Sequence, residues 1–230
     1  MGEWDWKLLV ALHRAPPLLA VIAPLRPPRK CATLAQSRSL GYANAGSSIE
    51  SPAVATKFTL LETPRLILRP ITPIDWAAIH RYMSDPAVTR WLPEGVLGEP
   101  AARAFAVKNA GEAATAIAVI ERETDEFVGH MVFHPWFVHA THEIGWVISA
   151  AHQGRGFATE AARALLSHAF GALQCHRVIA TCQPENPASW RVMEKLGMRR
   201  EAHFRSALHQ PSGEWWDEYF YALLAEEYAS

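Results

Sequence analysis

The stretch His152-Gln-Gly-Arg-Gly-Phe-Ala-Thr-Glu-Ala161 joins a glycine-containing turn directly to the start of an amphipathic helix. Gly154 and Gly156 have no Cβ, so the backbone here can turn tightly and approach a ligand closely. The first amides of the following helix lack partners within the helix and point outward at the positive end of its dipole. This stretch therefore predicts a binding site for a phosphate or pyrophosphate group.

The residues on either side of the turn are typical of a strand before it and a helix after it. Residues 143–148 are mostly apolar, and beyond the turn apolar residues recur at the spacing of one helical face. Those residues are Ala158, Ala161, Ala162, Leu165, Leu166, Ala169 and Phe170. The turn has neither the Gly-x4-Gly-Lys-Ser/Thr of P-loop proteins nor the Gly-x-Gly-x-x-Gly of dinucleotide-binding folds, so both classes are disfavoured.

Hydrophobic periodicity along the chain predicts an α/β protein. Strands are expected near 58–69, 114–121, 127–136, 142–148, 176–182, 199–207 and 215–224, and helices near 73–83, 99–110, 156–170 and 187–197. The helix at 156–170 lies between two strands. Because parallel neighbours need a crossover connection, 142–148 and 176–182 should be parallel.

Composition limits the partners and the compartment. The 230 residues carry a net charge of −1 with both signs interspersed, which gives no electrostatic basis for nucleic-acid binding. Cys31, Cys175 and Cys182 are an odd number at unpatterned spacing, so they predict neither a disulfide framework nor a zinc site. A reduced, cytoplasmic compartment is expected.

Residues 1–57 differ from the rest of the chain. Prolines interrupt every apolar run, and residues 26–51 have the composition of a linker. We expect a disordered or loosely ordered extension over 1–57 and one domain over 58–230. The apolar run Leu8–Leu25 is broken by His13, Arg14 and prolines, so no membrane span is predicted. A signal peptide is not predicted either, because Glu3 and Asp5 lie where positive charge is needed and the uninterrupted apolar run is too short.

Two further motifs, together with the turn, resemble the GNAT superfamily of acetyl-CoA-dependent N-acetyltransferases. Gln153-x-x-Gly156-x-Ala158 is similar to that family's pyrophosphate loop. The segment Pro184-Glu-Asn-Pro-Ala-Ser-Trp-Arg-Val-Met-Glu-Lys-Leu-Gly197 is similar to the later strand end and helix, in the form found in the branch of ribosomal-protein N-terminal acetyltransferases. The resemblance covers about 58–228, from Thr63-Pro-Arg-Leu-Ile-Leu-Arg69 to the closing strand at 215–224.

The resemblance implies a mixed, mostly antiparallel sheet whose central parallel pair splays apart to admit the pantetheine arm of acetyl-CoA. The implied reaction is direct acetyl transfer to a primary amine, either a protein N-terminus or a small molecule, without a metal. The expected cofactor-binding residues are Trp146, Val147 and Ile148 through their main chain, the loop Gln153, Gly154, Arg155, Gly156, Phe157 and Ala158, and Asn186 and Ser189.

Two residues are candidates for the chemistry. Glu143 is a carboxylate on an otherwise apolar strand, two residues from Gly145 on the same face, and burial is expected to raise its pKa into the range of a general base. Ser189 shares a helical face with apolar residues, and Met193 stands where many GNAT enzymes have a tyrosine. The resemblance to the ribosomal-protein branch implies that Ser189 assists the departing thiolate. The alternatives are a solvated rim carboxylate and a serine that bonds its own backbone.

Other assignments stay open at this stage. Asn186 precedes Pro187, so it could bind pantetheine or serve as a turn residue before the helix. The histidines at 130, 134, 139 and 142 have no acidic or cysteine partner at ligand spacing, which favours a structural or acceptor-site role. A non-catalytic acyl-CoA-binding module is the alternative function. The acceptor amine and a homodimeric assembly are not decided by the sequence.

Overall fold

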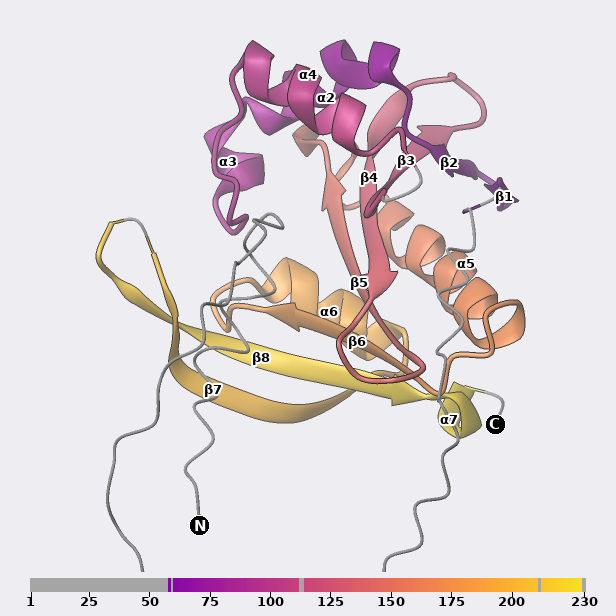
Figure 1. The fold of residues 1–230 in the computed structure, drawn as a ribbon, viewed down its shortest axis with the longest axis vertical. Helices are drawn as coiled ribbons and strands as arrows, with labels where there is room; N and C mark the ends of the chain where they lie inside the picture. The colour runs from indigo at the N-terminus through magenta and orange to yellow at the C-terminus, as the bar shows by residue number, and fades with distance from the viewer. Residues whose placement is uncertain (1–57, 59, 112–113, 211, 229–230) are drawn as a thin grey trace, which may run out of the picture. The chain divides into compact units, whose positions relative to one another are not determined.

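The computed structural model describes residues 58, 60–111, 114–210 and 212–228. They form one eight-stranded sheet in the order β1-β2-β3-β4-β5-β6-β8-β7 (Figure 1). The strands are β1 (Leu61–Glu62), β2 (Leu66–Pro70), β3 (Ala116–Glu121), β4 (Phe127–Pro135), β5 (Thr141–Ile148), β6 (Arg177–Cys182), β7 (Arg199–His209) and β8 (Trp215–Leu224). The predictions for residues 1–57, Cys31 included, lie outside the described residues.

The helices occur where the periodicity predicts them, with two short additions. They are α2 (Trp76–Met83), α3 (Pro86–Thr89), α4 (Glu99–Lys108), α5 (Phe157–Gly171), α6 (Pro187–Lys195) and α7 (Ala225–Tyr228). The four-residue helices α3 and α7 were not predicted, because they are shorter than the pattern of apolar residues can reveal. None of the described helices has the length and apolarity needed to cross a membrane.

The mixed sheet confirms the predicted fold class. All neighbouring strands are antiparallel except β5 and β6, which are parallel and joined through α5. The predicted opening strand at 58–69 is instead two strands, β1 and β2. They are separated by a turn in which the amide of Thr63 donates to the carbonyl of Leu66 at 2.9 Å.

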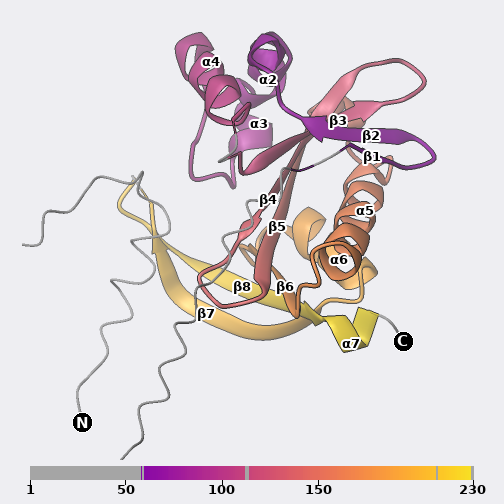
Figure 2. The same ribbon diagram turned by 45° about the vertical axis from the view of Figure 1, so that its right-hand side comes forward.

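The parallel pair separates soon after it forms. β5 and β6 are in register only at Thr141–Arg177, His142–Val178 and Glu143–Ile179, and the remaining residues of the two strands have no ladder partners in each other. In Figures 1 and 2, β6, β8 and β7 run across the lower half of the domain, while β4 and β5 rise steeply away from them. The residues after Glu143 therefore border an opening in the middle of the sheet.

Alternation along β4 and β5 supplies a core on each face of the sheet. Ile144 and Ile148 pack on the face covered by α5, together with Phe157 and Leu165. Val147 points to the other face and packs with residues of α2 and α4. Both cores are needed because the sheet is covered on both sides in its first half, and together they fix the orientation of β5.

His130 is buried within the second core. It lies on β4, its Nδ1 is hydrogen-bonded to the hydroxyl of Tyr82 at 2.7 Å, and its ring packs against Phe105. Burial lowers the pKa of His130 from its ordinary value of 6.5 to about 4. The structural role expected for this histidine fits its position.

This burial predicts a loss of stability in mild acid. Below pH 6.5 the unfolded chain takes up a proton at His130 that the folded chain resists until about pH 4, so the free energy of unfolding falls as the pH drops through this window. Between pH 7.5 and pH 5, His130 alone should lower the free energy of unfolding by roughly 2 kcal/mol. Urea titrations of the wild type and His130→Gln at both pH values measure it.

The variant should lose less stability between the two pH values than the wild type. His80→Gln, at a partly exposed histidine of α2, is the matched control and should behave like the wild type. An equal loss in the wild type and in His130→Gln would contradict the assignment.

Candidate active site

The turn between β5 and α5 has the backbone geometry that its glycines indicate. Gly154 and Gly156 have φ values of +74° and +81°, in the left-handed region that residues with a Cβ adopt only at a cost. Gly156 is the N-cap of α5, so the chain reverses immediately before the helix begins at Phe157.

The main chain of this turn presents a row of free donors. Within the described residues, the amides of 154–159 donate hydrogen bonds to no protein acceptor, and the first backbone bond of α5 runs from Glu160 to the carbonyl of Gly156 at 3.0 Å. Six consecutive unpaired amides at the positive end of a 15-residue helix suit an anion with several oxygens. The turn therefore fits a pyrophosphate group.

The side chains of the turn are held within the protein. The amide of Gln153 donates to the carbonyl of Ile148 at 3.0 Å, and Arg155 forms an ion pair with Glu121 while its guanidinium lies 4.5 Å from the ring centroid of Phe157. Gln153 and Arg155 were expected to face phosphates, but here their side chains brace the loop. Phe157 is 1% exposed, so at this position only its amide is offered to a ligand.

Two edges of main chain border the opening between β5 and β6. At the two ends of the β4–β5 pair, the amide of Trp136, just after β4, donates to the carbonyl of Thr141 at 2.8 Å, and the amide of Ser149, just after β5, donates to the carbonyl of Val128 at 2.9 Å. Because an antiparallel ladder alternates, the odd residues of β5 pair with β4, and the peptide groups of Trp146 and Ile148 face the opening. Val147, whose main chain was also expected to border the opening, lies at an odd position and pairs with His130 of β4 instead.

Asn186 and Ser189 lie at the start of α6, beyond the end of β6. Asn186 is the N-cap, and its Oδ1 accepts a hydrogen bond from the amide of Ser189 at 3.3 Å. This is the turn-residue role that the sequence left open, and it leaves the Asn186 NH₂ group without a bond among the described residues. The Ser189 hydroxyl also makes no hydrogen bond to a described residue, which disfavours a serine that bonds its own backbone.

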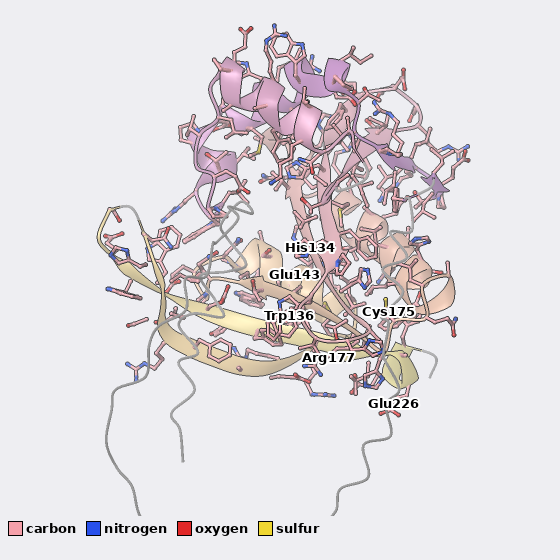
Figure 3. All side chains as sticks on the ribbon, in the orientation of Figure 1. His134, Trp136, Glu143, Cys175, Arg177 and Glu226 are labelled. Atoms are coloured by element: carbon pink, nitrogen blue, oxygen red, sulfur yellow. The ribbon has the colours of Figure 1, made fainter. Side chains whose placement is uncertain are left out.

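Glu143 lies at the point where β5 and β6 separate. Its side chain is 25% exposed, and its Oε2 lies 3.9 Å from Nε2 of His134, the residue directly opposite on β4 (Figure 3). The absence of a side chain at Gly145 opens little space beside Glu143, because a Cβ there would already lie 3.4 Å from Cβ of Val132. Glu143 is thus a partly accessible carboxylate with a histidine neighbour, which sequence spacing could not reveal.

Two aromatic side chains of β8 each contact a tryptophan from another part of the chain. Trp136 contacts Phe220 of β8 at a centroid distance of 5.6 Å, and Trp91 contacts Trp216 at 5.4 Å. Figure 3 places Trp136 on the same hairpin as His134 and Glu143. Trp91 thereby connects the segment after α3 to the hairpin of β7 and β8.

A pocket of about 620 Å³ lies beside the start of α5. It is lined in part by Gly156 and Thr159 and by three cationic side chains, Arg65, Arg163 and Lys195. The grouping of these cations could not be predicted from the sequence, because they come from the turn before β2, from α5 and from α6. Of the three, only Arg65 belonged to a recognised motif, Thr63-Pro-Arg65, and that motif was assigned to the opening strand alone.

Among the described residues, one group of side chains has ligand types that could hold a metal ion, and its members are too far apart in the sequence to form a motif. Side-chain ligand atoms of Glu121, Glu126 and His152 lie within 4.8 Å of one another. Each carboxylate already has a cationic or histidine partner, because Glu121 is paired with Arg155, and Glu126 lies 3.0 Å from Nε2 of His152. Burial alone would raise the pKa of Glu121, but the hydrogen bond from Arg155 holds it below its usual range.

The two described cysteines are unsuited to nucleophilic chemistry. Burial raises the pKa of Cys175 to about 11 and, together with the nearby Glu218, that of Cys182 to about 12. At neutral pH both side chains are thiols, whereas the thiolate is the reactive form.

Comparison with known proteins agrees with this geometry. Residues 65–199 match the model of the acetyltransferase (GNAT) domain. The chain is 48% identical over 169 residues to the uncharacterized N-acetyltransferase YnaD of Bacillus subtilis, covering 73% of this chain and 98% of that protein. The chain belongs to the GNAT acetyltransferase family.

Two solved structures have the same fold as this GNAT domain. A GNAT-family acetyltransferase from Bacillus anthracis superposes with a TM-score of 0.70 at 45% identity, covering 74% of this chain and all of that one. A putative ribosomal-protein-serine acetyltransferase from Vibrio cholerae gives a TM-score of 0.62 at 22% identity, over 74% of this chain and 99% of that one. The second likeness, at this identity, concerns the fold alone.

The loop geometry predicts the effect of a side chain at position 156. Gly156→Asp adds a Cβ at a φ of +81° and a negative charge beside the free amides, so the affinity for CoA should fall at least about tenfold. Gly171→Asp makes the same change in open space at the other end of α5, and it should leave the affinity unchanged. Calorimetry measures both, and an unchanged affinity in a folded Gly156→Asp protein would reject the site.

Proposed function

We propose that this GNAT protein is an acetyl-CoA-dependent N-acetyltransferase that transfers the acetyl group directly to a primary amine. The observation that carries the proposal is the combination of an opening between β5 and β6 with a row of free amides at its mouth. Both lie at the carboxyl ends of parallel strands, where α/β sheets bind their ligands.

The ends of acetyl-CoA are matched by different groups. The amides of 154–159 bind the pyrophosphate, and the nearby pocket with Arg65, Arg163 and Lys195 suits the remaining phosphate of the nucleotide. Between the separation point at Glu143 and the end of β5 at Ile148, the strand extends about 16 Å. A pantetheine arm lies along this edge, with its amides bonded to the peptide groups of Trp146 and Ile148.

A direct transfer is favoured over an acyl-enzyme. Acetyl-CoA supplies an activated thioester, so the protein needs to orient an amine, take a proton from it and assist the departing sulfur. The two described cysteines are protonated and buried, which makes a covalent route through them unfavourable. The C–N bond forms as the C–S bond breaks, in one site.

Glu143 is proposed as the acceptor of the amine proton. It stands at the closed end of the opening, and His134 beside it provides a second group through which the proton can leave. The nitrogen Nδ1 of His134 is 3.1 Å from the carbonyl of Pro135, so Nδ1 carries hydrogen and Nε2 faces Glu143.

Ser189 is proposed as the donor to the departing thiolate, and Asn186 as a ligand of the pantetheine. The Ser189 hydroxyl is free among the described residues, while its amide is fixed by the cap. Met193, where many family members have a tyrosine, is 1% exposed and part of the core, so it cannot take over this role.

The acceptor is proposed to be a protein N-terminus or a small-molecule amine. The structural relative from Vibrio cholerae is titled a ribosomal-protein-serine acetyltransferase, which makes N-terminal peptides the first class to test. The alternative is a non-catalytic acyl-CoA-binding module, favoured only by Met193. Thiol release from acetyl-CoA with a panel of peptides, polyamines and aminoglycosides separates the two.

Replacement of Ser189 by alanine should slow the chemical step. A hydrogen bond that strengthens as the thiolate departs acts in the transition state, so kcat should fall roughly tenfold to a thousandfold while the affinity for acetyl-CoA stays nearly intact. Ser189→Thr keeps the hydroxyl and should retain most of the rate. Normal turnover by Ser189→Ala would leave Ser189 as a helix-start residue only.

Replacement of Glu143 by glutamine should change the pH dependence of the rate. Without a base, the reaction depends on amine that is already deprotonated, so activity should be depressed most at neutral pH and partly recover at higher pH. Steady-state rates from pH 6.5 to 9.5 test this. A uniform reduction at all pH values would instead indicate that Glu143 only shapes the site.

A further inference from the structure

Both carboxylate oxygens of Glu160, on the first turn of α5, accept hydrogen bonds from the turn between β1 and β2. The hydroxyl of Thr63 donates to its Oε1 at 2.6 Å, the amide of Arg65 donates to the same oxygen at 3.0 Å, and Nε of Arg65 donates to Oε2 at 2.7 Å. Burial would raise the pKa of Glu160, but these hydrogen bonds outweigh it and hold the pKa below its usual value. We call Thr63, Arg65 and Glu160 the latch.

The latch extends to the loop that precedes α5. Nη1 of Arg65 donates to the carbonyl of Arg155 at 3.0 Å, and its guanidinium lies 4.9 Å from the ring centroid of Phe157. A Cβ on Gly156 would lie 3.5 Å from Nη2 of Arg65. One side chain thus holds both the first turn of α5 and the peptide group between Arg155 and Gly156.

This contact determines where the donors of the loop point. A peptide group is planar, so fixing the carbonyl of Arg155 also fixes the direction of the Gly156 amide on the opposite side of the bond. The flanking glycines allow many other backbone conformations, and they supply no restraint of their own. Besides the Gln153 and Arg155 side chains, a restraint comes from the turn between β1 and β2, where Arg65 lies 90 residues before Arg155 in the sequence.

We propose that Arg65 is a positioning residue for acetyl-CoA, which acts through the Arg155 carbonyl and depends on Glu160 for its own orientation. The proposal rests on the proposed function, because the loop's ligand is taken to be the pyrophosphate of CoA. Arg65 is suited to this role since its planar guanidinium reaches a carboxylate and a carbonyl at the same time, which a lysine ammonium does not do in a fixed geometry.

Two substitutions of opposite charge separate positioning from simple attraction. Arg65→Gln removes a positive charge near the phosphates, and Glu160→Gln removes a negative one. If Arg65 only attracted phosphate, Glu160→Gln would strengthen CoA binding. Under the proposal, both variants weaken CoA binding, and the Kd for CoA rises at least about tenfold in each. Arg65→Gln removes the donor to the Arg155 carbonyl, whereas Glu160→Gln turns an NH₂ group toward the Arg65 donors and so displaces the guanidinium.

The remaining variants test the geometry. Arg65→Lys keeps the charge and should bind CoA as weakly as Arg65→Gln. In the double variant Arg65→Gln/Glu160→Gln, the Kd for CoA should be about that of the single variant that binds CoA more weakly. The two effects should not add, because both substitutions break the same Arg65–Glu160 contact. Arg122→Gln is the matched control: Arg122 bonds the carbonyl of Thr63 in the same turn at 2.9 Å and should leave the Kd within twofold.

Calorimetry with CoA reports affinity and stoichiometry separately. A positioning role raises the Kd with one binding site per folded chain, whereas a merely structural role lowers the fraction of competent sites at an unchanged Kd. Unchanged or tighter binding by Glu160→Gln, or wild-type binding by Arg65→Lys, would overturn the proposal while the wild type still binds CoA. Absence of CoA binding by the wild type would reject the proposed function, and the positioning role with it.

Discussion

The pairing between β5 and β6 ends at Glu143 and Ile179, and the site depends on that interruption. A sheet normally satisfies every peptide group of its central strands, so two central strands that part leave donors and acceptors on facing edges. In this protein the peptide group of Trp146 and the N–H of Ile148 are among them, while the carbonyl of Ile148 accepts a hydrogen bond from Gln153. The opening is stable because both faces of β5 are covered, by α5 on one side and by α2 and α4 on the other.

The same interruption gives the two crossover helices related roles. α5 follows β5 and α6 follows β6, so the N-terminal ends of both helices lie at the carboxyl ends of the diverging strands (Figure 2). The first helix offers free amides, and the second offers an asparagine cap with a free serine hydroxyl beside it. Glu143 lies at the opposite, closed end. Ligand binding and chemistry are thereby placed along one edge of one strand.

Charge pairing completes the arrangement around the loop. Arg155 is held by Glu121 and Arg65 by Glu160, so the two cations nearest the free amides are both neutralised and oriented by carboxylates. Recognition of an anion at this site therefore depends on the direction of the main-chain N–H groups more than on unpaired cationic side chains. Arg163 and Lys195 add a more open cationic wall on one side.

The sequence by itself determined the elements and the chemistry of the loop. Helical periodicity located α5, the crossover rule made β5 and β6 parallel, and the two glycines with the helix start indicated an anion site, because these properties depend on residues close together in the chain. Tertiary structure alone decided which peptide groups of β5 face the opening, how Arg155 is used and which cations surround α5. Those outcomes depend on the β4 register and on contacts such as Arg65 with Glu160, which link residues 95 positions apart. No local pattern specifies a contact across that distance, since the folded sheet brings its two partners together.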